Sequence, residues 1–170
     1  MIYEPREDSF LLQKYVERYS RGKVLDIGTG SGIQALTAMK KTKDVLAVDI
    51  DESSVIYAIS KGINAIQSNL FQNVNGRFDL IILNPPYLPK DINENKEVAR
   101  LVSGGKEGKE LIEEFFSKVR AYLNKDGKVL VVFSSLSGDV LGCIKRNNFN
   151  YKKLDEQSFF FEKLFIYLVY

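Results

Sequence analysis

The tetrapeptide Asn84-Pro85-Pro86-Tyr87 directly follows the apolar run FDLIIL and is an unusual way to end a buried strand. Proline has no backbone N–H, so the two prolines take the chain out of a sheet and stiffen it, while their carbonyl groups remain acceptors. The Asn84 amide oxygen and the Pro85 carbonyl could together accept both hydrogens of a planar NH2 group. Tyr87 offers a flat face for stacking. Because the nitrogen of such a group is a weak nucleophile, orientation is the main help that a protein can give it.

A second chemically promising segment is VLDIGTGSG, residues 24–32, in which an apolar run leads into Gly28, Gly30 and Gly32. Glycines let the backbone approach a ligand closely, although similar spacing also occurs in dinucleotide sites. Asp49 ends the next apolar run about 20 residues later, where a carboxylate can bind both hydroxyls of a ribose. Asp26 would repel a pyrophosphate and attract a cation. The pattern therefore favours S-adenosyl-L-methionine, which has a sulfonium and an ammonium group and no phosphate, over a nicotinamide cofactor.

Each of these residues also has a purely structural interpretation. Asp26 and Asp49 could be solvated strand ends, and two prolines alone suffice to end a strand. Asn69, which follows the third apolar run in the segment QSNLF, could accept a hydrogen bond from an adenine amine or could be a turn residue. The order of strand, glycine loop, helix and second acid favours the interpretation as a site.

Composition excludes several classes of protein. The net charge of +2 does not support direct nucleic-acid binding, which usually requires a strongly basic face. The chain has no histidine and a single cysteine, Cys143, so we expect no disulfide framework, no metal site and no Ser-His-Asp catalysis. We also expect no secretory signal and no membrane helix, because the apolar stretch 159–170 is interrupted by Glu162 and Lys163. We expect a cytoplasmic protein with one domain, residues 1–170.

The elements that must position these residues alternate along the chain. We predict helices over 9–20, with Ser9 as the N-cap, and over 32–41, 52–62, 109–123 and 136–148. We predict strands over 23–28, 44–50, 63–67, 77–84 and 127–134, and two more near 150–157 and 159–169. This order indicates an α/β fold with a mostly parallel sheet and an antiparallel C-terminal hairpin. The long connection 88–108 is predicted to be either functional or disordered, because loops of that length are uncommon in a compact domain.

The motifs together resemble a known family. VLDIGTGSG, AVDI and NPPY resemble class I S-adenosylmethionine-dependent methyltransferases that modify planar amino groups. YEPREDSFLL, residues 3–12, resembles the opening signature of HemK-related glutamine methyltransferases of the archaeal and eukaryotic type. SGGKEGKELIEEFF, residues 103–116, resembles the segment that follows NPPY in that group. The resemblance implies a Rossmann-like, doubly wound sheet of seven strands.

The resemblance also implies a reaction, which is methylation of the glutamine side-chain amide in the Gly-Gly-Gln loop of a class I translation release factor. It places the glutamine amide against Asn84, Pro85, Pro86 and Tyr87. It implies that the cofactor site is lined by Ser9, Asp26, Gly28, Gly30, Gly32, Asp49, Ile50, Asn69 and Leu70. Position 69 is often acidic in relatives, so the asparagine here is a departure.

Two partners follow from the resemblance. Bacterial members carry a helical release-factor-binding domain before the catalytic one, and we expect none here because the signature starts at residue 3. Archaeal and eukaryotic relatives often work as a heterodimer with a small zinc-binding activator protein, and we expect it at the sheet edge formed by residues 63–67. That segment could instead be an ordinary short edge strand.

Alternative functions remain at this point. The first is a nucleic-acid amine methyltransferase acting on adenine or guanine, because the tetrapeptide suits a flipped base as well as an amide. The second is a non-catalytic cofactor-binding or scaffold module. Other protein side chains are further possible acceptors.

Overall fold

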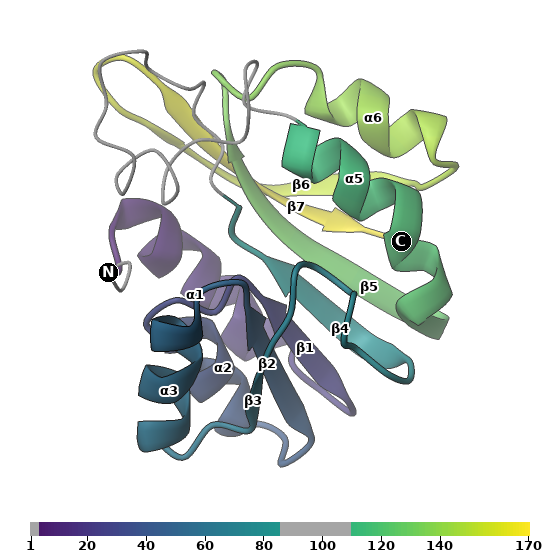
Figure 1. Cartoon of the computed structure of the whole chain (residues 1–170). Helices are drawn as coiled ribbons and strands as arrows, with labels where there is room; N and C mark the ends of the chain where they lie inside the picture. The colour runs from purple at the N-terminus through teal and green to yellow at the C-terminus, as the bar shows by residue number, and fades with distance from the viewer. Residues whose placement is uncertain (1–3, 86–109) are drawn as a thin grey trace.

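The computed structural model describes residues 4–85 and 110–170 (Figure 1). The first half begins with helix α1 and then alternates strands and helices. Its elements are α1 Glu7–Tyr19, β1 Val24–Ile27, α2 Ile33–Met39, β2 Val45–Asp49, α3 Glu52–Ser60, β3 Ala65–Gln67 and β4 Phe78–Leu83. The second half contains α5 Glu110–Lys118, the 3-10 helix η1 Val119–Tyr122, β5 Leu123–Ser134, α6 Val140–Arg146, β6 Tyr151–Ser158 and β7 Lys163–Val169.

The strands form one seven-stranded sheet in the order β3-β2-β1-β4-β5-β7-β6. Neighbouring strands from β3 to β5 run parallel, whereas β7 is antiparallel to both β5 and β6. The strand order reverses between β1 and β4, and in such open sheets ligands bind beyond the carboxyl ends of the strands at this point. The predicted α/β fold, with a doubly wound, mostly parallel sheet and an antiparallel C-terminal hairpin, is confirmed.

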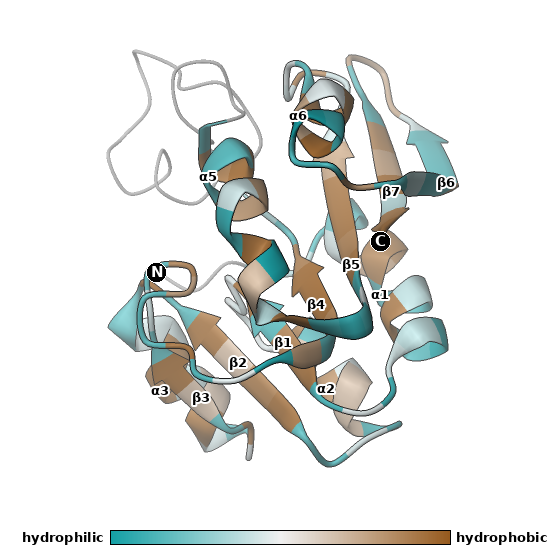
Figure 2. Ribbon diagram, turned by 90° about the vertical axis from the view of Figure 1, so that its right-hand side faces the viewer, coloured by the Kyte–Doolittle hydropathy of each residue, from teal (hydrophilic) through white to brown (hydrophobic). Residues whose placement is uncertain are grey.

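Two hydrophobic clusters cover the two faces of the sheet. Along β4, Leu80 and Ile82 point into one cluster and Ile81 and Leu83 into the other, as the alternation of a strand requires. Helices α1, α2 and α3 cover one face, and α5 and α6 cover the other. Figure 2 shows the central strands in brown, since apolar side chains occupy both of their faces.

The predicted N-cap at Ser9 is wrong. Helix α1 begins at Glu7 after Arg6, and Ser9 lies buried in its first turn. Glu7 and Asp8 extend the helix upstream, because acidic side chains are favourable near the positive end of the helix dipole. Ser9 is therefore held inside the fold.

The helix predicted over 109–123 ends earlier than expected. Its α-helical part stops at Lys118, and a 3-10 turn leads into β5 at Leu123, which pairs with Phe78. The Tyr122 ring stacks on Phe71 with ring centroids 4.3 Å apart, so tertiary packing overrides helical periodicity here. Within the ranges that the structure describes, no helix is long and apolar enough to cross a membrane.

Candidate active site

The segments that follow β1, β2, β3 and β4 meet at one edge of the sheet. The backbone N–H groups of Gly28 and Thr29 both donate to the Val48 carbonyl, at 2.9 and 3.0 Å. The Ser68 N–H donates to the Asp49 carbonyl at 2.8 Å. These bonds fix the glycine loop and the segment after β3 against the end of β2. The topology thus brings together residues that lie far apart in the sequence.

Asp26 is a buried acid and not a solvated strand end, because only 2% of it is exposed. Its Oδ2 accepts hydrogen bonds from the Thr29 hydroxyl at 2.7 Å and from the Ala35 N–H at 3.2 Å. Burial raises the pKa of Asp26 to about 6, and the nearby Asp49 adds to the increase although the two hydrogen bonds oppose it. Asp26 therefore ties the glycine loop to α2 and carries a negative charge at neutral pH.

Asp49 connects the glycine loop to the end of β2. Its Oδ2 accepts from the Gly30 N–H and its Oδ1 accepts from the Asp51 N–H, both at 2.9 Å. Burial raises the pKa of Asp49, while these N–H groups partly offset the rise. An ionised carboxylate has about four acceptor positions, so Asp49 retains acceptor capacity for ligand hydroxyl groups.

The glycine loop uses a backbone conformation that other residues rarely adopt. All three predicted loop glycines, Gly28, Gly30 and Gly32, have φ angles between +51° and +79°. A Cβ at Gly32 would also lie 2.5 Å from Cδ1 of Ile63. Glycine is needed there for its φ angle, and an added Cβ would in addition force the end of the Ile63 side chain to shift.

Three further predicted cofactor residues lie beyond β2 and β3. Ile50 is apolar and 65% exposed, and it directly follows Asp49. Asn69 is exposed, whereas the neighbouring Leu70 is buried in spite of its left-handed φ of +48°. This φ costs a leucine roughly 1–2 kcal/mol, and such outliers are enriched at ligand sites.

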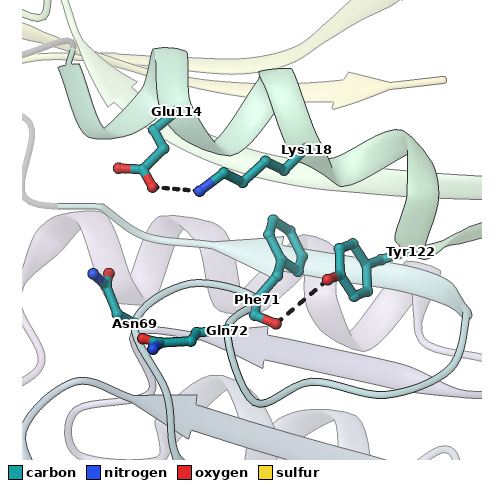
Figure 3. A pocket seen from close by; sticks show the side chains of 6 residues that line it. All are labelled: Asn69, Phe71, Gln72, Glu114, Lys118 and Tyr122. Atoms are coloured by element: carbon teal, nitrogen blue, oxygen red, sulfur yellow. Dashed lines mark hydrogen bonds and ion pairs between the residues drawn. The ribbon is translucent and has the colours of Figure 1, made fainter.

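Asn69 also borders a cavity of about 300 Å3 between the segment after β3 and helix α5 (Figure 3). The stacked pair Phe71 and Tyr122 and the ion pair Lys118–Glu114, at 2.6 Å, form much of its wall. The cavity does not include Asp26, Asp49 or Asn84. Its lining therefore shares only Asn69 with the predicted cofactor residues.

Asn84 and Pro85 directly follow β4 and lie next to the glycine loop. A Cβ at Gly28 would lie 4.0 Å from the backbone oxygen of Asn84. Asn84 Nδ2 donates to the hydroxyl of Ser9 at 3.3 Å. Asn84 Oδ1 is buried and accepts no hydrogen bond from the part of the chain that the structure describes. The side chain is thus anchored at its nitrogen, and its oxygen is an acceptor that no described residue uses.

The rest of the predicted tetrapeptide, Pro86 and Tyr87, lies outside the described residues, as does the connection 88–108. Ser9, by contrast, does reach the site, because α1 places it beside Asn84. The other predicted cofactor residues lie at this edge of the sheet as well, with Asp26 and Asp49 near the carboxyl ends of β1 and β2 and the rest on the loops that follow the strands.

Sequence reasoning missed several polar contacts. The Thr29 hydroxyl binds Asp26, and Gln34 Nε2 donates to the Ser9 carbonyl at 2.9 Å. Gln34 is itself buried, and its Oε1 has no partner among the described residues. The sequence did offer one signal for Gln34, which is a polar residue in the first turn of the helix that follows the glycine loop. Its partner, the Ser9 carbonyl, lies 25 positions away and could not be inferred from the sequence.

The residues at this edge fit S-adenosyl-L-methionine. Asp26, when ionised, would attract a cationic ligand, and the free acceptor positions of Asp49 would suit ribose hydroxyls. Ile50 exposes an apolar side chain against which an adenine ring would pack. The left-handed glycines bring bare backbone close to the acids. A buried and a half-buried carboxyl group, those of Asp26 and Asp49, would be unfavourable for a pyrophosphate.

Comparison with known proteins identifies relatives. The family model described as methyltransferase small domain matches residues 7–143. A protein of Methanocaldococcus jannaschii, named for protein N5-glutamine methyltransferase activity, is 37% identical over 81% of this chain and 75% of its own length. The release factor glutamine methyltransferase of Agrobacterium fabrum is 29% identical over 62% of this chain. The match covers only 45% of that bacterial protein.

A nucleic-acid enzyme and a solved structure are also similar. The tRNA1(Val) (adenine(37)-N6)-methyltransferase of Pedobacter heparinus is 30% identical over 71% of this chain and 56% of its own length. A chain of the E. cuniculi Mtq2–Trm112 complex, responsible for methylation of the eRF1 translation termination factor, superposes with a TM-score of 0.81. The match covers 99% of this chain and 97% of that chain at 22% identity, so it shows a shared fold. Together these matches confirm the resemblance inferred from the motifs.

Proposed function

The chain belongs to the methyltransferase small domain family, and from this premise we propose that it methylates the side-chain amide nitrogen of a glutamine. The acceptor is the Gly-Gly-Gln loop of a class I translation release factor. Two relatives support this acceptor by their names: the protein N5-glutamine methyltransferase of Methanocaldococcus jannaschii and the bacterial release factor glutamine methyltransferase.

One observation carries the proposal most directly, namely the unused acceptor at Asn84. Its Oδ1 is buried and has no hydrogen-bond partner in the described chain. Leaving such a group unpaired costs about 1–3 kcal/mol, so a ligand donor is the natural explanation. A glutamine amide has two N–H donors, and the carbonyl of Pro85 is the neighbouring candidate for the second.

The chain's own residues then act by orientation. S-adenosyl-L-methionine supplies an electrophilic methyl group on a sulfonium. Asn84 and Pro85 would hold the planar amide so that its nitrogen lone pair faces this methyl group, where an N–C bond would form as the C–S bond breaks and its electron pair leaves on the sulfur. The methylated nitrogen would then lose its proton to solvent. No strong base is required beforehand, which agrees with a chain that contains no histidine.

A nucleic-acid amine is the second candidate acceptor. The similarity to the tRNA1(Val) adenine methyltransferase favours it, and a flipped adenine also presents a planar NH2 group. The net charge of +2 argues against it, because nucleic-acid enzymes usually present a strongly basic surface.

Transfer of a radiolabelled methyl group separates these acceptors. We expect label in a class I release factor, no label in the same factor with its loop glutamine changed to alanine, and no label in tRNA or duplex DNA. Equal labelling of the glutamine-free factor would overturn the assignment to glutamine. Labelling of tRNA alone would establish the second candidate.

We further propose a small zinc-binding activator protein as partner. Strand β3 ends the sheet and pairs with β2, and the adjacent helix α3 exposes Ile56 and Ile59, which are 61% and 54% exposed. A partner strand on this edge would cover both features. The Mtq2–Trm112 complex provides the precedent for a heterodimer. We place the protein in the cytoplasm, where its release factor substrate acts.

A further inference from the structure

Ser9 was expected to line the cofactor site, but in the structure its hydroxyl contacts the side chains of Asn84 and Asp8. It is 2% exposed, and its hydroxyl accepts the hydrogen bond from Asn84 Nδ2 at 3.3 Å. The same hydroxyl lies 3.3 Å from Asp8 Oδ1, to which it donates. The Ser9 N–H donates to the same Asp8 oxygen at 2.6 Å. Asp8, Ser9 and Asn84 thus form a continuous chain of hydrogen bonds.

The direction of this chain decides how the Asn84 amide is turned. A hydroxyl group has one hydrogen to donate and accepts through its lone pairs. Because Asp8 receives the Ser9 hydrogen, Ser9 presents a lone pair to Asn84 and binds its NH2 end. The opposite end of the amide, Oδ1, then points away from Ser9. If the hydroxyl hydrogen were free, it could bind Oδ1 instead, and the amide could turn around.

Other contacts keep Ser9 itself in place. The Ser9 carbonyl accepts from Gln34 Nε2 at 2.9 Å, which links α1 to α2 beneath the site. Asp8 is only 4% exposed, so water does not readily compete for its bond with Ser9. The arrangement is therefore rigid where it meets Asn84.

We propose that Asp8 and Ser9 are positioning residues that set the orientation of the Asn84 amide, so that Oδ1 faces the acceptor amide. This inference rests on the proposed function only in naming that acceptor. The orientation itself is a property of the protein without any ligand. In this proposal Ser9 acts by orienting Asn84 and not by contacting the cofactor directly.

The first test compares Ser9→Ala with Ser9→Thr, which keeps the hydroxyl. We expect Ser9→Ala to lower kcat at saturating cofactor and release factor about tenfold, which corresponds to the loss of one hydrogen bond. The dissociation constant of S-adenosyl-L-methionine, measured by titration calorimetry, should change less than about twofold. Ser9→Thr should recover most of the loss. An unchanged kcat with weaker cofactor binding would overturn the proposal and make Ser9 a cofactor ligand.

The second test needs no acceptor and therefore stands even if the release factor is not the substrate. In nitrogen–proton NMR spectra, the side-chain amide signals of Asn84, identified by their absence in Asn84→Ala, should shift in Ser9→Ala and in Asp8→Ala. They should remain near the wild-type positions in Ser9→Thr. Unmoved signals in both alanine variants would overturn the proposal. Absence of methyl transfer by the wild-type protein would instead count against the proposed function.

Discussion

At the scale of single residues, Asp26 combines two tasks that conflict. It is buried, which disfavours its charge, yet in the proposed site it would have to be charged to attract a cationic ligand. The hydrogen bonds from Thr29 and Ala35 partly offset the cost of burial. The resulting pKa of about 6 leaves Asp26 mostly ionised at neutral pH and sensitive to mild acid.

This predicts that cofactor binding weakens in mild acid. With a pKa of about 6, Asp26 is mostly protonated at pH 5, so the dissociation constant of S-adenosyl-L-methionine should be about tenfold higher there than at pH 7.5. Titration calorimetry at both pH values measures this. Asp26→Asn should bind weakly at both values, and an equal pH dependence in that variant would show that another group is responsible.

The raised pKa of Asp26 affects the stability of the fold in the opposite direction, because ionisation favours cofactor binding but disfavours folding. The pKa of Asp26 is raised from 3.8 to about 6 in the folded protein, so the folded state holds the proton more tightly than the unfolded state. Its contribution to the free energy of unfolding is therefore present below about pH 4 and is lost as the pH rises through 6. Asp26→Asn should stabilise the cofactor-free protein at pH 7, by up to about 3 kcal/mol.

At the scale of elements, the turn between β1 and α2 depends on Gly32. Its φ of +79° is strained for any other residue, and a Cβ would collide with Cδ1 of Ile63 at 2.5 Å. Gly62, which follows α3, has a similar φ of +82° with no atom within 4 Å of its Cβ position. A comparison of substitutions at Gly32 and Gly62 therefore separates the cost of backbone strain, which both share, from the cost of the contact with Ile63, which only Gly32 has.

We therefore predict that Gly32→Ala destabilises the protein more than Gly62→Ala. Gly62→Ala should lower the free energy of unfolding by about 1 kcal/mol, because it places an L-residue in a left-handed backbone conformation without a steric clash. Thermal or urea unfolding measures both. Ile63→Val removes Cδ1 and should recover part of the loss in Gly32→Ala as a coupling energy. Equal losses in the two glycine variants, with no coupling, would contradict the steric argument.

The elements were largely predictable from the sequence because their signals are local. Short apolar runs indicated the strands of the parallel part of the sheet and β7, and a glycine indicated the end of α3. Ser9 was misassigned because its local pattern suits a cap, whereas its neighbours Glu7 and Asp8 extend the helix. The end of α5 was missed because the Tyr122–Phe71 stack is a long-range contact.

The site acids were predictable from strand ends, but the Ser9–Asn84 bond joins residues 75 positions apart and has no local signature.

At the scale of the whole molecule, all seven strands form one sheet with a hydrophobic cluster on each face. We infer from this that the chain works as a single domain. Its sheet has an edge at β3, and the neighbouring helix α3 carries exposed isoleucines. This edge lies at the opposite end of the sheet from the β6–β7 hairpin (Figure 1). A partner can therefore bind there without covering the hairpin.

The proposed activator contact can be tested on α3. Ile59→Lys should weaken binding of the Trm112-like protein from the same genome at least tenfold, because it buries a charge against the partner. Met39→Lys, on exposed surface of α2, is the matched control and should bind normally. Sedimentation velocity measures both complexes. Normal assembly of the Ile59→Lys protein would place the partner elsewhere.

The central claim is that Asn84 orients a planar amide beside a methyl donor, and the kinetics of Asn84→Ala test it most directly. If orientation is the main contribution, kcat for methylation of the release factor should fall about 100-fold or more. The dissociation constant of S-adenosyl-L-methionine, measured on the same preparation, should stay nearly unchanged. Wild-type turnover in Asn84→Ala would contradict the account, and so would a loss that arises entirely from weaker cofactor binding.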